Sequence, residues 1–189
     1  MEVKSEKDII RIIQKDQWMV DILQAASTLD LPDWWICAGF VRSKIWDVLH
    51  GFDERTEMAD IDVVYFDAEN MDESIEKKLE ERLYNLMPHI PWSVKNEARM
   101  HMRNGLEPYT STRDAISKFP ETATAFGVRL DDNDNVVLTA PHGVDDLLQM
   151  IVRPTPLFKE SDLLMEIFMD RVNKKKWEFR WSMVRQSNE

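Results

Sequence analysis

Two aspartates, Asp60 and Asp62, open the strongest strand pattern in the sequence, which runs from Asp60 to Phe66. β-Branched and aromatic residues dominate the second half of this segment, as is typical of strands. Alternate residues of a strand point to the same face, and two residues rise by roughly 6.6 Å, so the two carboxylates can converge on one cation. Ile61 and Val63 point the other way. The pattern predicts a strand that is anchored by an apolar face and presents two acids on the other.

Two carboxylates held side by side raise each other's pKa, and a cation removes that cost. Magnesium takes oxygen ligands, and it usually binds one or two protein carboxylates together with phosphate oxygens. Two such ions about 3.5–4 Å apart can activate an attacking oxygen and stabilise the leaving one. The pair therefore indicates a site for Mg²⁺ (or Mn²⁺) that serves phosphoryl chemistry. The competing interpretation is that an Asp-x-Asp pair is only a surface feature at a strand end.

A glycine, Gly39, stands between a short apolar strand expected over residues 34–38 and a helix expected from Val41 to about Leu49. A turn glycine before a helix lets backbone N–H groups approach phosphate, and the helix N-terminus favours negative charge. Arg42 lies in the first turn of that helix, where its guanidinium can fork onto phosphate oxygens. A simple tight turn and a surface cation are the alternatives for Gly39 and Arg42.

The segment Cys37–Asp47, taken together with Ala59–Phe66, resembles the nucleotidyltransferase superfamily, whose fold is that of DNA polymerase β. The superfamily pattern is a hydrophobic-Gly-Gly/Ser turn followed by Asp-hydrophobic-Asp/Glu-hydrophobic. The Gly-x-Val-Arg segment is similar to the heads of tRNA nucleotidyltransferases and poly(A) polymerases. Residues 92–101 and 140–147 also resemble blocks of a family of small bacterial nucleotidyltransferase-like proteins of uncharacterised function. With these blocks the resemblance covers roughly residues 5 to 185.

The resemblance implies transfer from a nucleoside triphosphate, with Asp60 and Asp62 as the catalytic and metal-binding residues. It also implies a third acid on a later strand, for which Glu97, on or just after the third expected strand, is the candidate. Phe40 stands where a second Gly or a Ser would follow the turn glycine, so only its backbone N–H can contact phosphate. Lys95 shares the predicted strand face of Glu97 and is a further candidate for binding the nucleotide. A salt-bridged surface lysine is the alternative there.

The apolar periodicity predicts an α+β (α/β-like) fold with a mixed β-sheet flanked by helices. Helices are expected over residues 5–29, 41–49, 74–87, 98–103, 114–119 and 144–151, strands over 34–38, 60–66 and 92–97, a hairpin over 126–130 and 136–138, and a basic, tryptophan-rich helix or strand over 168–184. Without a repeat or a linker, residues 1–189 are expected to form a single domain. Its core motif spans 34–103, and the C-terminal extension 104–189, with the hairpin and helices, packs on it.

The formal net charge of −11 argues against a protein that grips nucleic acid by its phosphates, because that mode needs a basic surface. No extended nucleic-acid surface is therefore expected, and the acceptor is left open between a small molecule, a protein and an RNA end. No apolar run is long enough for a membrane helix, and the charged N-terminus is no secretory signal, so cytoplasmic residence and no membrane contact are expected. The lone Cys37 predicts a buried, inert thiol.

Near the C-terminus, Trp177 and Trp181 stand four residues apart among basic residues. This arrangement can bind single-stranded nucleic acid, but it more often docks onto a core. The sequence favours a metal-dependent nucleotidyltransferase with an unidentified hydroxyl acceptor. Two alternatives remain: a catalytically silent nucleotide-binding protein of the same fold, and an interaction protein in which the Asp pair only caps a strand.

Overall fold

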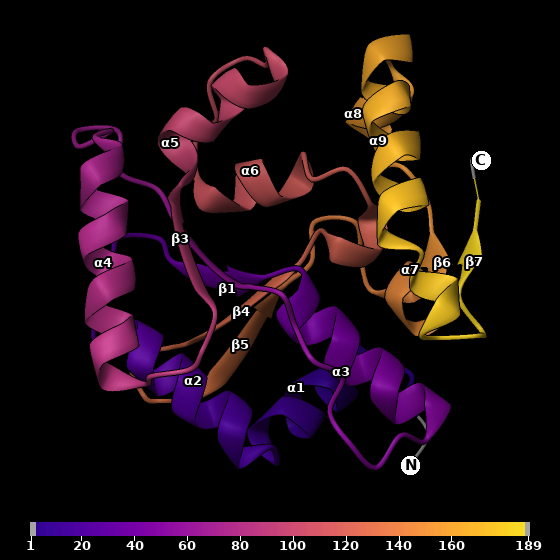
Figure 1. Ribbon diagram of the computed structural model, residues 1–189, viewed down its shortest axis with the longest axis horizontal. Coiled ribbons are helices and arrows are strands. Elements are labelled where there is room, and N and C mark those ends of the chain that lie inside the picture. The colour runs from indigo at the N-terminus through magenta and orange to yellow at the C-terminus, as the bar shows by residue number, and fades with distance from the viewer. Residues whose placement is uncertain (1–2, 188–189) are drawn as a thin grey trace.

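The computed structural model of the protein describes residues 3–187. Within these residues the main sheet has five strands in the order β3-β2-β1-β4-β5 (Figure 1). The strands are β1 Trp35–Cys37, β2 Ile61–Tyr65, β3 Trp92–Asn96, β4 Gly127–Leu130 and β5 Val136–Thr139. β2 and β3 run parallel, and the other neighbours are antiparallel. The prediction of a mixed sheet in an α+β fold is thereby confirmed, and the segment after residue 104 completes the sheet that the first half begins.

Helices cover both faces of this sheet. They are α1 Glu6–Gln14, α2 Gln17–Ser27, α3 Gly39–His50, α4 Glu73–Leu86, α5 Glu97–Met100, α6 Thr112–Ser117, α7 Asp145–Leu148, α8 Pro156–Lys159 and α9 Asp162–Lys175, with 3-10 turns η1 His101–Asn104, η2 Thr122–Thr124 and η3 Trp177–Phe179. Figure 1 shows α1, α2 and α3 on one side of the sheet and α5 and α6 on the other, with α4 beside β3 and α9 at the far end. A small parallel sheet pairs β6 Ile151–Val152 with β7 Arg185–Gln186. No helix in the described part of the chain is long and apolar enough to cross a membrane.

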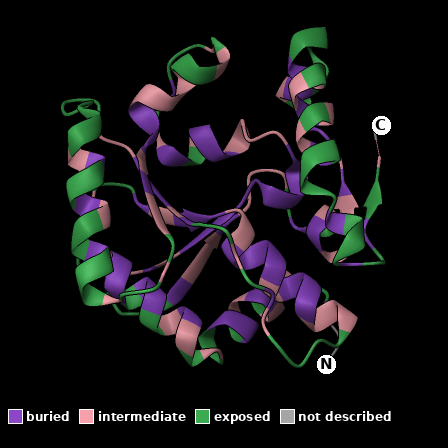
Figure 2. Cartoon of the chain, in the orientation of Figure 1, coloured by how far each residue is buried: buried purple, intermediate pink, exposed green. Residues whose placement is uncertain are grey.

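The period-two alternation of β2 divides the apolar residues between two clusters. Ile61 and Val63 are buried in the large cluster on the side of α1, α2 and α3, as predicted. Val64 points to the opposite face and joins a small cluster with Cys37 and Ile116. Figure 2 shows the buried interior along the sheet and α3. Because Asp62 shares the face of Val64, the fold directs this acid toward α6 rather than into the main core.

The prediction of one helix over residues 5–29 is wrong, because the chain breaks at Asp16. Asp16 leaves the helical conformation, and its carboxylate accepts a hydrogen bond from the Met19 backbone N–H, which caps α2. The same carboxylate pairs with Lys44 and Arg55, each at 2.8 Å. An N-cap aspartate stabilises a helix start by about 1 kcal/mol, and here two cations from distant segments add to it.

Further helix boundaries differ from the prediction, and α6 spans Thr112–Ser117 rather than residues 114–119. α7 ends at Leu148 rather than at residue 151, because Ile151 belongs to β6. The helix expected from residue 168 begins at Asp162, where the Ser161 side chain caps it. Gly51 ends α3 in the left-handed conformation, as predicted for its cap.

Candidate functional site

A cavity of about 350 Å³ opens between the N-terminus of α3, the start of β2, the end of β3 and α9. Its lining includes Ala38, Gly39, Arg42, Asp60, Asp62, Val64, Ser93, Lys95, Glu97, Met100, Arg103, Phe119, Pro120, Thr124, Arg171 and Lys175. The fold thus brings the three predicted acids, the turn glycine, Arg42 and Lys95 to one place. Phe40 is the exception among the predicted site residues, because its side chain does not line the cavity.

The two aspartates lie at the start of β2. Asp60 is exposed and precedes the first strand residue, whereas Asp62 is half-buried within the strand. Burial and the neighbouring charge of Asp60 raise the pKa of Asp62, and a hydrogen bond from Ser93, its register partner on β3, acts against that rise. Ionised carboxylates in this position are disfavoured without a cation.

The donor set of this pair fits a hard cation. Among residues 3–187, no group of three or more His, Cys, Asp or Glu side chains is arranged to hold a metal ion. Magnesium does not need such a group, because it commonly binds one or two carboxylates and completes its shell with substrate phosphates and water. Asp60 and Asp62 supply that pair of carboxylates; burial and then the charge of Asp60 raise the pKa of Asp62, and a bound cation would act in the opposite direction.

Glu97 is the first residue of α5 and not part of β3, so the expectation that it shares a strand face with Lys95 is wrong. The helix starts here because the Asn96 side chain caps it by accepting a hydrogen bond from the Ala98 N–H at 3.1 Å. Glu97 is 5% exposed. Burial first, and then the charge of Asp62, raises its pKa to about 8.

The raised pKa of Glu97 has a consequence for stability. In the unfolded chain the carboxyl ionises near its ordinary pKa of 4.5, but in the folded protein it stays protonated up to about pH 8. The free energy of unfolding therefore decreases as the pH rises from about 4.5 to 8. We expect Glu97→Gln to remove this loss, which is on the order of a few kcal/mol because one pKa unit corresponds to about 1.4 kcal/mol.

Urea unfolding of the metal-free protein at pH 5 and pH 9 measures this effect. Glu97→Gln should gain stability over the wild type at pH 9 and much less at pH 5. The exposed Glu107→Gln is the matched control and should show no such difference. Parallel pH profiles of Glu97→Gln and wild type would contradict the assignment.

Lys95 lines the cavity, but its ammonium also forms salt bridges with two glutamates of α4. Its ammonium lies 3.5 Å from the fully buried Glu76 and 3.4 Å from Glu80. Glu76 also accepts two hydrogen bonds of 2.7 Å from Arg99. The alternative interpretation of Lys95 as a salt-bridged lysine is therefore confirmed. A contact of Lys95 with phosphate stays a prediction.

The turn before α3 is displaced by one residue from the expected position. Ala38, and not Gly39, has a positive φ of 53° with ψ −115°, a backbone conformation that favours glycine. The two small residues of the turn are thus Ala38 and Gly39. Phe40 belongs to the main core, where it is 1% exposed and its ring lies 6.1 Å from that of Trp18.

The N-terminus of α3 at this turn is uncapped. No side chain caps it, and the N–H groups of Gly39, Phe40 and Val41 have no acceptor within residues 3–187, whereas the Arg42 N–H bonds to the Ala38 carbonyl at 3.1 Å. Free N–H groups and the positive end of the helix dipole together make a ready anion site. The predicted backbone contacts of Gly39 and Phe40 with phosphate have the free donors that they require.

Ala38→Gly is expected to stabilise the protein by about 1 kcal/mol. Relief of a strained backbone raises the free energy of unfolding by about 1–3 kcal/mol. The added entropy of glycine in the unfolded chain lowers it by about 0.5–1 kcal/mol. Chemical denaturation measures the change. The exposed Ala68, which has no positive φ, is the control, and Ala68→Gly should lower the free energy of unfolding instead. A loss of stability in both variants would mean that Ala38 stores no strain.

Arg42 is 9% exposed, and within residues 3–187 it has aromatic rings around it instead of a carboxylate partner. Its guanidinium carbon lies 4.8 Å from the ring centre of Trp177, 5.4 Å from that of Trp46 and 5.8 Å from that of Trp181. Burial lowers the pKa of Arg42 to about 10, so it remains charged at neutral pH. The interpretation that Trp177 and Trp181 dock onto the core is confirmed, and the docked rings hold Arg42 at the cavity.

The cavity residues that were missed as site residues include Ser93, Arg103, Arg171 and Lys175. Arg171 and Lys175 belong to the basic stretch that the sequence displays, and their spacing of one helical turn places both on one face of α9. The spacing could have predicted that the two cations share a helix face. It could not have predicted that this face lies near Asp60 and Asp62, because the segments are far apart in the sequence. Ser93 became visible as a site residue only through its register with Asp62.

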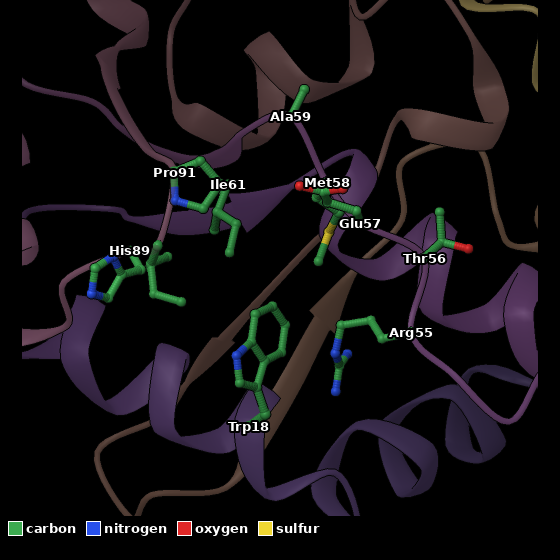
Figure 3. Close-up of a pocket in the computed structure, with 10 residues that line it drawn as sticks. Trp18, Arg55, Thr56, Glu57, Met58, Ala59, Ile61, His89 and Pro91 are labelled. Carbon is green, nitrogen blue, oxygen red and sulfur yellow. The ribbon is translucent and has the colours of Figure 1, made fainter.

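A larger cavity of about 590 Å³ lies on the other side of β2. Ile61, which points away from the two acids, lines it together with the loop from Arg55 to Ala59, and Figure 3 shows Trp18 and Arg55 side by side at its wall. The Arg55 guanidinium carbon lies 3.9 Å from the Trp18 ring centre. Neither Asp60 nor Asp62 lines this cavity, so the smaller one is the candidate functional site.

Known proteins share this fold and part of the sequence. A family model described as nucleotidyltransferase matches residues 24–186. An NMR structure described as revealing a CCA-adding enzyme head domain is 36% identical, covers 99% of this chain and 98% of its own, and superposes with a TM-score of 0.89. A comparison with curated protein sequences finds no match.

Longer enzymes show the same fold at lower identity. The Thermotoga maritima CCA-adding enzyme complexed with tRNA is 13% identical, with a TM-score of 0.57, and the match covers 98% of this chain and 43% of that one. A CCA-adding enzyme in complex with ATP is 16% identical, with a TM-score of 0.55, and the match covers 98% and 42%. This chain therefore spans less than half the length of these two enzymes.

Proposed function

The chain belongs to the nucleotidyltransferase family, and we propose that it moves a nucleoside monophosphate from a nucleoside triphosphate to a hydroxyl acceptor. One observation carries the proposal: Asp60 and Asp62 face the uncapped N-terminus of α3 across a single cavity. Carboxylates for a cation and free N–H groups for phosphate are the two halves of a magnesium–nucleotide site. The cavity volume of about 350 Å³ lies in the range of small-molecule sites.

In this proposal Asp60 and Asp62 hold Mg²⁺ (or Mn²⁺). When bound, the metal supplies positive charge that offsets the charge on the transferring phosphoryl group. The N–H groups of Gly39 and Phe40 and the guanidinium of Arg42 hold the triphosphate. Binding in a fixed geometry supplies most of the catalysis in reactions of this type, because the protein has little covalent chemistry to perform.

The transfer forms a bond between the acceptor oxygen and the α-phosphorus and breaks the bond from that phosphorus to the pyrophosphate oxygen. The acceptor hydroxyl loses its proton, and Glu97 is the group proposed to take it. Because the pKa of Glu97 is about 8, only its ionised fraction can accept the proton, and this fraction grows as the pH rises toward 8. The acceptor itself is left open between a small molecule, a protein and an RNA end.

A catalytically silent nucleotide-binding protein is the second candidate function. Glu97 is protonated at pH 7, because its pKa is about 8, so Asp60 and Asp62 are the predicted catalytic acids left to act as carboxylates there. A protein that binds nucleotide through this pair without transferring it would retain the same cavity. Release of pyrophosphate distinguishes the two functions.

A thermal-shift screen of the four nucleoside triphosphates, with and without Mg²⁺, tests the proposal. A ligand at a hundredfold excess over its dissociation constant stabilises the folded state by about 2.7 kcal/mol. We expect one or more nucleotides to raise the melting temperature only when Mg²⁺ is present, and Asp60→Asn/Asp62→Asn to lose this shift.

The exposed pair Asp132 and Asp134 has the same spacing and lies in the turn between β4 and β5, so Asp132→Asn/Asp134→Asn is the matched control. The control should keep the shift. Pyrophosphate released in the presence of an acceptor then supports the enzyme over the silent protein. A wild type that shows no shift with any nucleotide contradicts both functions and favours an interaction protein.

A further inference from the structure

α9 brings two cations to the cavity that the acids also line. Arg171 and Lys175 are four residues apart on this helix, so they lie on the same face, and both line the cavity that contains Asp60 and Asp62. The Lys175 ammonium forms no ion pair or hydrogen bond within residues 3–187. Two cations of a protein with a net charge of −11 are thus directed at a site rather than at a surface carboxylate.

Arg171 is fixed in place by a carboxylate far away in the sequence. Its Nε donates a hydrogen bond of 2.6 Å to Glu121 Oε1, and Glu121 is 0% exposed. The other oxygen of Glu121 accepts a hydrogen bond of 2.8 Å from the Thr124 hydroxyl. Neither Nη group of Arg171 has a partner in the described part of the chain. An arginine held through Nε keeps two parallel donors, which match two oxygens of a phosphate group.

A third cation adds to this charge. Arg42 lies near enough to Arg171 that the charge of Arg171 lowers the pKa of Arg42, while Glu121 acts in the opposite direction. The cavity is therefore lined by three cations, Arg42, Arg171 and Lys175. The buried carboxylate of Glu121 binds only the Nε of Arg171. Asp60 and Asp62 line the same cavity, but none of the three cations forms an ion pair with either aspartate within residues 3–187.

We propose that Arg171 and Lys175 form a phosphate-binding subsite on α9, with Glu121 as the positioning residue that orients Arg171. The inference rests on the proposed function. It assigns the carboxylates of the cavity to the metal ion and the cations of α9 to a phosphate group bound in the same cavity. The ligand is a phosphate group with at least two free oxygens, and it belongs either to the polyphosphate of the nucleotide or to the acceptor.

Lys175→Ala is the first test, because it removes a charge without leaving a buried partner unpaired. Titration calorimetry with inorganic tripolyphosphate should show a dissociation constant raised roughly tenfold or more, since a hydrogen bond to a charged group is worth about 1.5–3 kcal/mol. Lys174→Ala is the matched control: Lys174 is exposed, lies on the same helix and does not line the cavity, so its removal should leave the affinity unchanged.

Arg171→Lys is the second variant. It keeps the charge and a donor for Glu121 but loses the two free Nη groups, so it should also weaken binding. A double-mutant cycle with Glu121→Gln shows whether Glu121 acts through Arg171. Glu121→Gln should raise the dissociation constant in the wild type and change it little in the Arg171→Lys background. Equal effects in both backgrounds would remove Glu121 from the subsite.

A short single-stranded ribo-oligonucleotide serves as the second probe and separates the two sources of phosphate. If tripolyphosphate binding weakens in Lys175→Ala, the subsite holds the phosphates of the nucleotide. If only oligonucleotide binding weakens, it holds a phosphate of the acceptor. Unchanged affinity for both probes, in a protein that still binds a nucleoside triphosphate, overturns the subsite and leaves the proposed function standing. A wild type that binds no nucleoside triphosphate overturns the proposed function instead.

Discussion

Asp62→Asn is expected to abolish nucleotidyl transfer and, at the same time, to stabilise the metal-free protein. Loss of a metal ligand removes several kcal/mol of transition-state stabilisation, so the rate should fall on the order of a thousandfold. Stability changes in the opposite direction, because burial and Asp60 raise the pKa of Asp62. The ionised side chain is therefore disfavoured in the folded protein above its ordinary pKa of 3.8, and asparagine removes that penalty.

Two measurements check this expectation. Pyrophosphate release reports the transfer, and urea unfolding with a chelator reports the stability at pH 7. The exposed Asp132→Asn is the control for the loss of one charge and should change neither quantity strongly. Transfer that survives in Asp62→Asn would show that the reaction does not use this carboxylate, and a loss of stability would show that Asp62 is already paired with positive charge.

Asp47→Ala is expected to lower the free energy of unfolding by about 2–4 kcal/mol. Asp47 is buried and accepts three hydrogen bonds: from the Thr56 N–H at 2.8 Å, from the Thr56 hydroxyl at 2.6 Å and from the Trp181 ring N–H at 2.9 Å. Its removal leaves two buried N–H groups without a partner, and each costs about 1–3 kcal/mol.

Asp47→Ala should also weaken nucleotide binding at the candidate functional site. Asp47 ties α3 both to the loop that leads to Asp60 and to Trp181, which contacts Arg42. The affinity for the magnesium–nucleotide complex should therefore fall together with stability. Chemical denaturation and nucleotide titration measure the two effects, and the exposed Asp53→Ala in the same loop is the control. Asp47→Ala with the stability of that control would contradict the role of this carboxylate.

The sequence by itself determined the main strands, the acid pair and, to within one residue, the turn before α3, because these depend on neighbours along the chain. The β-branched run after Asp60 specifies a strand, and its alternation places Ile61 and Val63 in the core. Gly39 and Arg42 lie at a helix start because the apolar strand before them ends there. The nucleotidyltransferase family could be recognised from these local patterns alone, and it is confirmed by the match over residues 24–186.

The tertiary structure decided the features that join distant segments. Asp16 breaks the first predicted helix, where it meets Lys44 and Arg55. The residue of the turn with a positive φ is Ala38 and not Gly39. Glu97 moved from a strand face to a buried helix start.

The cations opposite the acids were also decided in this way. Glu121 holds Arg171 across 50 residues, and Trp181 reaches Asp47 across 134. Such contacts leave no periodic pattern in a single sequence, because the partners share neither a helix face nor a strand. They form only when the completed sheet and α9 bring them together, and for this reason the acids of the site could be predicted while most of its cations could not.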